Sequence, residues 1–549
     1  MVHMNALLES IQENCVYPFN PIIAEGVSVH QMEGAIKHIE NALILSSHSF
    51  PPQLKYEGIR PCTPEEEYQY ISFKRNQQHT LELAPSNIYM VNLMFSWDGV
   101  MLPPKPVFIP YVDKAGIIYL RGKKFTVLPV LADETLSVAK GDIFVPFLSA
   151  KITFKRKQYW FKMNGVQKVE YLVYSKIHHH DPAKQPRRST RANNSVKCDH
   201  TMAHYLFGKY GVKRVFKMYC NADIEIIEGP VDYNKYPEDK YTVCTSSQIR
   251  PRSVKNRNNY VPTDIKIIIE NNKLGTGALG LICGFFYVLD HYPARFSAEY
   301  FDNSEDELRL WRVILGHAIF RNNDNEGTLY NSVNEHYDSL DLYMDDMTKE
   351  GLTSEGYPVE NLWDLMARLI FDFTEIILNT DASSMYGKKL EVLRYVLADI
   401  VKAVSIFKYK ISSIKNREFT YNDISKYLSR YIKPEVIFNG LNKKHNEIVS
   451  VPSAGDNIMF NHTSRLILQE NATGSTRGKR KTAVSFKDPS RLLHTSIAVC
   501  GSILALPKAE PTGKVVLNPC CPLDKSYKLK CPPEFKKQLD QIQRDISQG

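Results

Sequence analysis

The sequence predicts an α+β protein built from several domains. A chain of 549 residues is long enough for about two to four domains, each with its own buried core. From Pro106 to about Phe161, short runs rich in β-branched and aromatic residues are typical of strands. From about Ser304 to Asn439, apolar residues recur at helical spacing. Strand-like and helical sequence therefore occupy different parts of the chain.

The β-rich region is predicted to hold an extended run, a hairpin and two further strands. The extended run is V-F-I-P-Y-V, which begins at Val107, and the hairpin turns near Arg121 and Gly122. F-L-S-A-K-I-T-F-K, from residue 147, and Q-Y-W-F-K-M-N-G-V, from residue 158, are predicted as two separate strands. Before this region, short helical patterns alternate with polar turns.

The clearest helical pattern runs from Lys388 to Lys410. Its apolar stripe indicates a helix packed against a core, and it consists of Leu390, Leu393, Leu397, Ile400, Val404, Phe407 and Ile411. The apolar segment from Leu274 to Leu289 is too short to cross a membrane and is predicted to be a buried element. After Ile448 the regular patterns fade, and a last helix is predicted near Pro533 to Ile546.

Positive charge is concentrated near the carboxyl end. The net charge is +9, and residues 451–549 hold 15 Lys or Arg against 8 Asp or Glu. In this region N-A-T-G-S-T-R-G-K-R-K-T-A-V, from Asn471, packs four cations into five residues. A solvated turn is one interpretation, and a glycine-spaced loop that follows a phosphate backbone is the other. Two more basic stretches, 178–194 and 250–259, are predicted loops. Such uneven charge favours a polyanionic partner.

The amino terminus and the cysteines indicate an intracellular protein. The first residues lack a basic region followed by an apolar run, so no signal peptide is expected. Ten cysteines without such a signal favour reduced thiols in a cytoplasm.

No motif forms a complete catalytic constellation. Gly275, Gly277 and Gly280 fit the spacing of a dinucleotide-binding loop. That mechanism needs the glycine turn to join a strand directly to a helix, but N-N-K-L intervenes, and no second strand follows. A nucleotide site of this kind is therefore not expected.

Three partial metal patterns are also incomplete. An acidic row is more typical of a solvated helix face than of a metal site, and it consists of Asp338, Asp341 and Asp345. A Cys/His group lacks the spacing of a structural zinc site, and it consists of Cys198, His200 and His204, near His178 to His180. Cys520, Cys521 and Cys531 also lack a second ligand pair.

Four segments, taken in order, carry a resemblance to a known family. The first is I-P-Y-V-D-K-A-G-I-I-Y-L-R-G-K-K-F-T-V-L-P, from Ile109. The second joins F-L-S-A-K-I-T-F, from Phe147, with Tyr159-Trp160-Phe161, and the third is G-K-K-L-E-V-L-R, from Gly387. The fourth begins with N-H-T-S-R-L, from Asn461, and continues through D-P-S-R-L-L-H-T-S and P-K-A-E-P-T-G. Together they resemble the second-largest (beta) subunit of multisubunit RNA polymerases.

The resemblance implies the N-terminal half of a split beta subunit, as large (jumbo) bacteriophages encode it. Residues 1–137 would begin a β-rich protrusion-like domain, and residues 413–460 would return to it. Between them, residues 138–412 would form a large, mixed, lobe-like insertion that is helical from about 304. Residues 461–549 would form an irregular fork-like region beside the nucleic-acid channel.

The implied function is to hold DNA and the RNA–DNA hybrid in a phage DNA-dependent RNA polymerase. The implied nucleic-acid-binding residues lie in the fork-like region and are Arg465, Arg477, Lys479, Arg480, Lys481, Arg491, His494, Lys508 and Glu510. The expected partners are the C-terminal half of the beta-like subunit, beta-prime-like subunits, the DNA template and the RNA transcript. The expected location is the host cytoplasm or a phage-associated compartment. An alternative is a non-catalytic nucleic-acid-binding or virion structural protein.

Catalysis is expected on other chains. Nucleotidyl transfer uses Mg²⁺ ions, and the family holds them in an aspartate motif of its largest subunit. This chain lacks that motif, so no catalytic or metal-binding residue is expected in it. The chain alone should therefore be inactive.

Some positions depart from the family pattern. A serine that contacts rifampicin in bacterial enzymes corresponds to Ile467, and Thr463 and Ser464 replace a Lys-Arg pair ahead of Arg465. A rifampicin-resistant polymerase is therefore expected. Thr512 replaces a glutamate of the family, and the region 300–385 resembles no segment of it.

Overall fold

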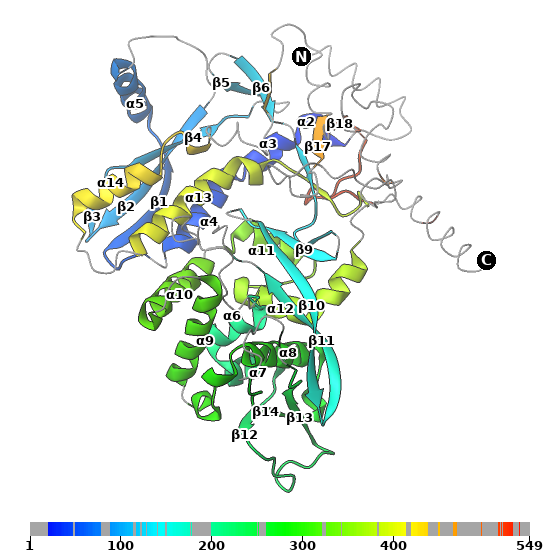
Figure 1. The fold of residues 1–549 in the computed structure, drawn as a ribbon. Helices are drawn as coiled ribbons and strands as arrows, with labels where there is room; N and C mark the ends of the chain where they lie inside the picture. Colours follow the sequence, from blue (N-terminus) through cyan, green and yellow to red (C-terminus); the bar gives the residue numbers. More distant parts are fainter. Residues whose placement is uncertain are drawn as a thin grey trace, which may run out of the picture. The chain divides into compact units, whose positions relative to one another are not determined.

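The computed structural model divides the chain into two compact units (Figure 1). Unit 1 comprises Met1–Glu134 and Asp381–Gly549, and unit 2 comprises Thr135–Thr380, which is inserted between the two segments of unit 1. The structure describes residues 20–47, 50–77, 88–112, 117–120, 123–127, 129–139, 141–148, 151–175, 177, 199–249, 251, 260–302, 304–320, 325–341, 343–380, 384–412, 419–437, 448–450, 465–468, 496, 514–516, 518, 520–530 and 537.

The predicted α+β class is confirmed, because both units combine helices with mainly antiparallel sheets. The inserted unit begins at Thr135, close to the start of the predicted lobe-like insertion at residue 138. It ends at Thr380, whereas that prediction extends to residue 412, so the helix before residue 412 belongs to unit 1.

Unit 1 is centred on an antiparallel sheet that packs against helices. β2 (Ile88–Trp97) pairs with β1 (Leu54–Pro61), β3 (Val100–Met101) and β4 (Lys105–Pro110), which is the predicted extended run. α4 (Ala35–Ser47) contacts β1 and α13 (Leu393–Ser412), and α13 also contacts α14 (Tyr421–Tyr431). The other described helices of unit 1 are α2 (Pro21–Glu25), α3 (Val27–Met32) and α5 (Pro64–Gln77).

Two small sheets join distant parts of unit 1. One pairs β6 (Lys123–Val127) with β5 (Ile117–Leu120) and β16 (Ile448–Ser450). Leu120 lies opposite Lys123, which confirms the predicted hairpin around residues 121 and 122. The other sheet has the order β15-β7-β17-β18, and its strands are β7 (Val130–Ala132), β15 (Lys389–Glu391), β17 (Arg465–Leu468) and β18 (Lys514–Val516).

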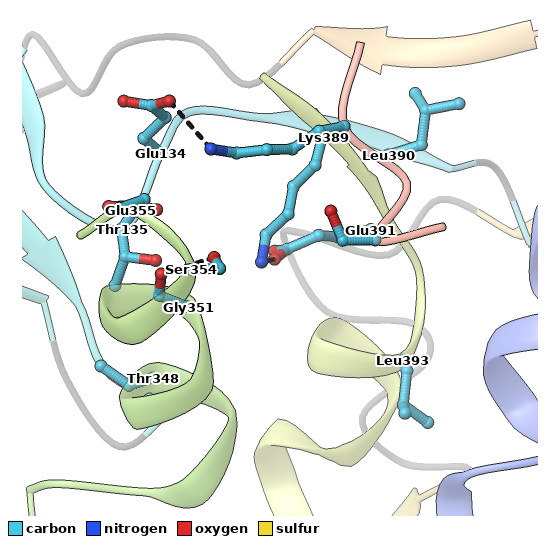
Figure 2. Close-up of polar contacts among 12 residues, drawn as sticks. Glu134, Thr135, Thr348, Gly351, Ser354, Glu355, Lys389, Leu390, Glu391 and Leu393 are labelled. Atoms are coloured by element: carbon cyan, nitrogen blue, oxygen red, sulfur yellow. Dashed lines mark hydrogen bonds and ion pairs between the residues drawn. The ribbon is translucent and has the colours of Figure 1, made fainter. Parts of the chain in front are cut away.

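Ion pairs and one buried amide hold this second sheet in place. Lys389 lies 3.2 Å from Glu391, and Lys528 donates to Glu134 at 3.2 Å (Figure 2). The buried Gln31 side chain donates to the Leu390 carbonyl oxygen and accepts from the backbone N–H groups of residues 392 and 393. These bonds satisfy backbone groups at the point where the chain returns from unit 2 and α13 begins.

Unit 2 is a seven-stranded antiparallel sheet covered by helices. Its strands are β8 (Ser137–Ala139), β9 (Asp142–Pro146), β10 (Lys151–Met163), β11 (Val166–Ser175), β12 (Ile224–Glu228), β13 (Tyr241–Ser246) and β14 (Ile265–Glu270). Its helices are α6 (Met202–Tyr210), α7 (Val212–Cys220), α8 (Thr276–His291), α9 (Ser304–Ile319), α10 (Glu326–Leu340), α11 (Asp346–Ser354) and α12 (Leu362–Asn379), with short 3₁₀ turns at Asn271–Lys273, Pro293–Arg295 and Ala298–Phe301. The main core lies between the sheet, α8 and the other helices.

Helix α8 explains the apolar segment and its glycines. The segment is buried, as predicted, because α8 contacts the sheet as well as α6 and α12. A Cβ atom at Gly284 would lie 2.4 Å from the Ala203 Cβ atom, and one at Gly280 would lie 2.7 Å from Ile370. The glycines therefore allow close helix packing. Because β14, before α8, pairs with antiparallel neighbours, the parallel arrangement of a dinucleotide-binding fold is absent around this helix.

Two element predictions are wrong. The sequences predicted as separate strands from residues 147 and 158 form one continuous strand, β10, whose pairing with β11 has no break. The helix predicted from Lys388 begins only at Leu393, because the preceding residues pair with β7 as strand β15. Leu390 is buried, but in the strand rather than in the helix.

Candidate nucleic-acid interface

The β10–β11 hairpin is the candidate interface, and its turn is fixed by local sequence. Asn164 and Gly165 both have positive φ angles, 45° and 78°, and Met163 pairs with Val166 across them. An Asn-Gly pair favours this two-residue turn, since asparagine tolerates and glycine readily adopts the left-handed conformation. The hairpin is a prominent element of unit 2 (Figure 1).

One face of the hairpin is anchored in the core of unit 2. The Phe161 ring stacks on Phe286 of α8, with centroids 6.3 Å apart. The Tyr159 hydroxyl donates to the buried Asp290 carboxylate at 2.6 Å, and Ser246 donates to the same carboxylate. Burial raises the pKa of the Asp290 carboxyl to about 6. This face fixes the position of β10.

The opposite face presents aromatic and basic side chains. Side chains alternate along a strand, so the residues that share this face are Arg156, Gln158, Trp160 and Lys162 of β10 with Gln167, Val169, Tyr171 and Val173 of β11. Val173, at the inner end of the face, is buried in the core of unit 2. Trp160 is 46% exposed and Tyr171 is 38% exposed. The set contains two cations and no carboxylate.

The basic side chains of this face are held by neighbours. The Arg156 guanidinium lies 4.4 Å from the centre of the Tyr171 ring and 5.8 Å from that of Phe373. It also donates to the Thr374 hydroxyl of α12 at 2.7 Å. Lys162 donates to the Gln248 side chain at 3.2 Å. None of these partners is a carboxylate, so both positive charges remain uncompensated by these bonds.

This arrangement has the chemistry of a single-strand binding surface. Nucleic-acid bases stack on exposed aromatic rings, and cations beside the rings attract the phosphate backbone. An exposed tryptophan that shares a sheet face with two positive charges offers both interactions. A carboxylate on the face would repel the backbone, and the face carries none.

The residues that the sequence predicts as nucleic-acid contacts are almost all beyond the described part of the chain. Arg465 is the exception: it begins β17 and pairs with Val516 of β18. The others lie outside the described residues, and they are Arg477, Lys479, Arg480, Lys481, Arg491, His494, Lys508 and Glu510. The predicted helix at 533–546 and the loop at 178–194 also lie outside them, apart from residue 537.

Sequence reasoning did not single out the hairpin face as a binding surface. The signal was present in K-R-K-Q-Y-W-F-K, where three cations precede three aromatic residues and a fourth cation follows, ahead of the Asn-Gly turn. It was missed because two strands were predicted in place of one. With that break, Arg156 lies between the two predicted strands and only Trp160 lies on a strand, whereas in the structure they share one face of β10.

The partial metal patterns have structural roles in unit 2. Asp345 caps α11 by accepting from the Thr348 N–H group, and Asp341 accepts from the Trp363 indole at 2.6 Å. The His204 ring bonds the Trp311 carbonyl oxygen at 2.9 Å. Within the described ranges, no group of three or more His, Cys, Asp or Glu side chains is arranged to hold a metal ion.

Two further findings concern the chain as a whole. Among the described residues, no helix combines the length and the hydropathy needed to span a bilayer. No curated protein matches the sequence. A family model described as "Non-virion RNA polymerase subunit" does match, over residues 4–532, and because this is nearly the whole chain, the protein belongs to that family of RNA polymerase subunits.

Proposed function

We propose that this chain is the N-terminal, beta-like part of a phage DNA-dependent RNA polymerase, and that it holds nucleic acid while partner subunits carry out catalysis. The family match supports an RNA polymerase subunit, and the order of the resembling segments supports the beta-like assignment. The proposed partners are the C-terminal half of the beta-like subunit and beta-prime-like subunits. A beta-prime-like partner would bind the Mg²⁺ ions that nucleotidyl transfer requires.

The exposed aromatic and basic face of the β10–β11 hairpin carries the nucleic-acid part of this proposal. A polymerase must hold every template sequence, so its contacts should depend on base stacking and phosphate charge rather than on base identity. Trp160 offers a ring for stacking, and Arg156 and Lys162 offer charge. We assign a second contact region to the basic loop around Arg477 and Lys481, on its composition.

The test compares Trp160→Ala with a matched control in the assembled polymerase. Stacking of one base contributes about 1–3 kcal/mol, so Trp160→Ala should weaken binding of a single-stranded oligonucleotide by roughly 5- to 100-fold. The control is Tyr233→Ala, which removes another aromatic side chain of unit 2 that is 55% exposed. Binding is measured by fluorescence anisotropy.

The outcomes separate clearly. We expect the Tyr233 variant to bind as the wild type does. Equal affinities for the wild type and the Trp160 variant would show that the hairpin face is an ordinary exposed sheet surface. Because the Trp160 side chain is half exposed, its removal should leave unit 2 folded, which circular dichroism checks.

A further inference from the structure

Helix α14 of unit 1 and the residues that follow it carry an exposed row of positive charges. Ile424, Leu428 and Ile432 are buried and lie four residues apart, so they mark the side that faces the core. Lys426, Arg430 and Lys433 are exposed. Lys426 and Arg430 lie one turn apart on the helix, and Lys433 follows two residues after its end. These three cations are called the α14 row.

The α14 row is not neutralised within the described part of unit 1. No ion pair joins any of its three cations to a described carboxylate. Asp423, the acid nearest in sequence to Lys426, forms the capping box of α14 with Thr420. The row therefore presents its charge to solvent.

A buried ammonium group lies beside this helix. Lys105, at the start of β4, is 9% exposed, and it donates to the Ser429 hydroxyl of α14 at 2.8 Å. Its only described hydrogen-bond partner is this hydroxyl, and no described carboxylate pairs with it. Burial without a counter-charge lowers the pKa of Lys105.

The surrounding sequence shows the same bias. Between Lys402 and Glu447 the chain has ten Lys or Arg against four Asp or Glu. This segment and residues 451–549 together hold more excess positive charge than the net +9 of the chain, so the remainder is net negative. Helix α14 lies wholly within this basic region.

Interaction with the helix dipole explains only two of the three cations of the α14 row. Cations near the carboxyl end of a helix interact favourably with its dipole, which applies to Arg430 and Lys433. Lys426 lies in the middle of α14 and gains little from the dipole, which acts within the last turn. The helix dipole therefore does not account for Lys426, which is exposed and available to an external anion.

The aromatic residues of α14 favour a backbone contact rather than a base contact. The Tyr427 and Tyr431 rings stack on each other at 6.2 Å, and the Arg430 guanidinium lies 5.8 Å from the Tyr431 ring centre. Because these ring faces are occupied, the helix offers charge and not an open stacking surface. The regularly spaced phosphates of a duplex match such a series of cations.

We propose that the α14 row binds the phosphate backbone of duplex DNA. The proposal rests on the proposed role of this chain in a nucleic-acid-binding polymerase, and it adds a second surface in unit 1. The hairpin face of unit 2 would contact single-stranded nucleic acid, whereas the α14 row would contact duplex DNA without regard to sequence.

The experiment measures the salt dependence of duplex DNA binding by the assembled polymerase. The variant is Lys426→Gln, Arg430→Gln and Lys433→Gln combined. Each lost phosphate contact lowers the slope of log K against log salt by about 0.9, so the triple variant should lose roughly 2 to 3 units of slope. A single-stranded oligonucleotide of the same length should show a smaller change.

A matched triple variant controls for the loss of three charges. Lys213, Lys217 and Lys235 of unit 2 are each paired with a carboxylate, that of Asp302, Asp223 and Glu225 respectively. Their replacement by Gln should leave the slope almost unchanged. Subunit composition is measured in parallel by size-exclusion chromatography with mass spectrometry.

Two results would overturn the proposal. An unchanged slope in the α14 variant, with all subunits present, would show that the row does not contact DNA. Loss of a partner subunit from the variant would show that the row binds an acidic protein surface instead. Either result leaves the proposed function standing, since that function depends on the separate effect of Trp160→Ala.

Discussion

At the scale of single residues, Trp160 and Asp290 lie on opposite sides of the same sheet and have opposite environments. Trp160 is half exposed, so its ring is available to a ligand. Asp290 is fully buried and accepts from Tyr159 and Ser246. Trp160 is therefore a candidate for ligand binding. Asp290 is expected to make the stability of unit 2 depend on pH.

Asp290→Asn should change the pH dependence of the stability of unit 2. The pKa of Asp290 is raised from 3.8 to about 6 by burial, so the folded state binds its proton more tightly than the unfolded state does. Its contribution is therefore most favourable below pH 4 and is lost as pH rises to about 6, by about 3 kcal/mol. In the asparagine variant this loss should disappear.

At each pH, the free energy of unfolding of the Asp290→Asn variant is compared with that of the wild type. Burial lowers the pKa values of His204 and His291 to about 4, so these groups cost stability as pH falls below 6.5, with the opposite sign. Both histidines are present in the wild type and in the variant, so their contributions to the free energy of unfolding cancel in the difference. Denaturant unfolding followed by tryptophan fluorescence from pH 4 to 7 measures it, and a difference that stays constant with pH would contradict the assignment.

Rifampicin resistance is a prediction that depends on one position of β17. Ile467 stands where the resembling family has a serine that contacts the drug, and it pairs with Lys514 and Val130 in the structure. A branched alkyl group removes a hydrogen bond and occupies drug volume, so the affinity should fall by several kcal/mol, on the order of a hundredfold or more. Run-off transcription across a rifampicin titration should show activity at concentrations that stop a bacterial enzyme. Inhibition at bacterial concentrations would mean that Ile467 has been matched to the wrong residue.

At the scale of elements, helix type was easier to predict than element boundaries. The buried stripe of α13 from Leu393 to Ile411 was recognisable because its spacing is helical. The strand β15 before it was not, because three residues give no period, and the pairing with β7 is set by a segment more than 250 residues away. The length of β10 was missed because its buried residues change from even to odd positions between Phe154 and Phe161, which disguises one strand as two.

Gly284→Ala tests whether the glycines of α8 serve packing. Alanine favours a helix over glycine by about 1 kcal/mol, so helix propensity alone predicts stabilisation. The new methyl group would lie 2.4 Å from the Ala203 Cβ atom of α6, and overpacking of this kind costs about 1–3 kcal/mol or more. We therefore expect net destabilisation in denaturant unfolding.

Gly275→Ala is the matched control for this prediction. Gly275 precedes α8 and has a negative φ of −89°, and a Cβ atom at this position would have no neighbour within 4 Å. Gly275 is also the N-cap of α8, where glycine is preferred over alanine, so its replacement should cost roughly 0.5–1 kcal/mol but cause no overpacking. If Gly284→Ala stabilised unit 2, the close contact with α6 would have to be wrong.

At the scale of the whole molecule, the order of the resembling segments along the chain predicted the protein family better than any single motif did. The family was predicted from weak matches that follow one another along the chain, and the family model confirms an RNA polymerase subunit. Unit 2 is inserted between two segments of unit 1, and its assignment as a lobe-like insertion stays a prediction. The hairpin face was not predicted from the sequence, because it depends on a cross-strand register that a linear pattern does not reveal.

The most direct test of the central claim is RNA synthesis across a size-exclusion profile. The chain is affinity-purified through a tag, separated by size, and each fraction is given template, nucleoside triphosphates and Mg²⁺. We predict that RNA appears only in fractions where this chain elutes with several large partner subunits, and that the chain alone makes none. RNA synthesis by fractions that contain this chain as a single polypeptide would contradict the account.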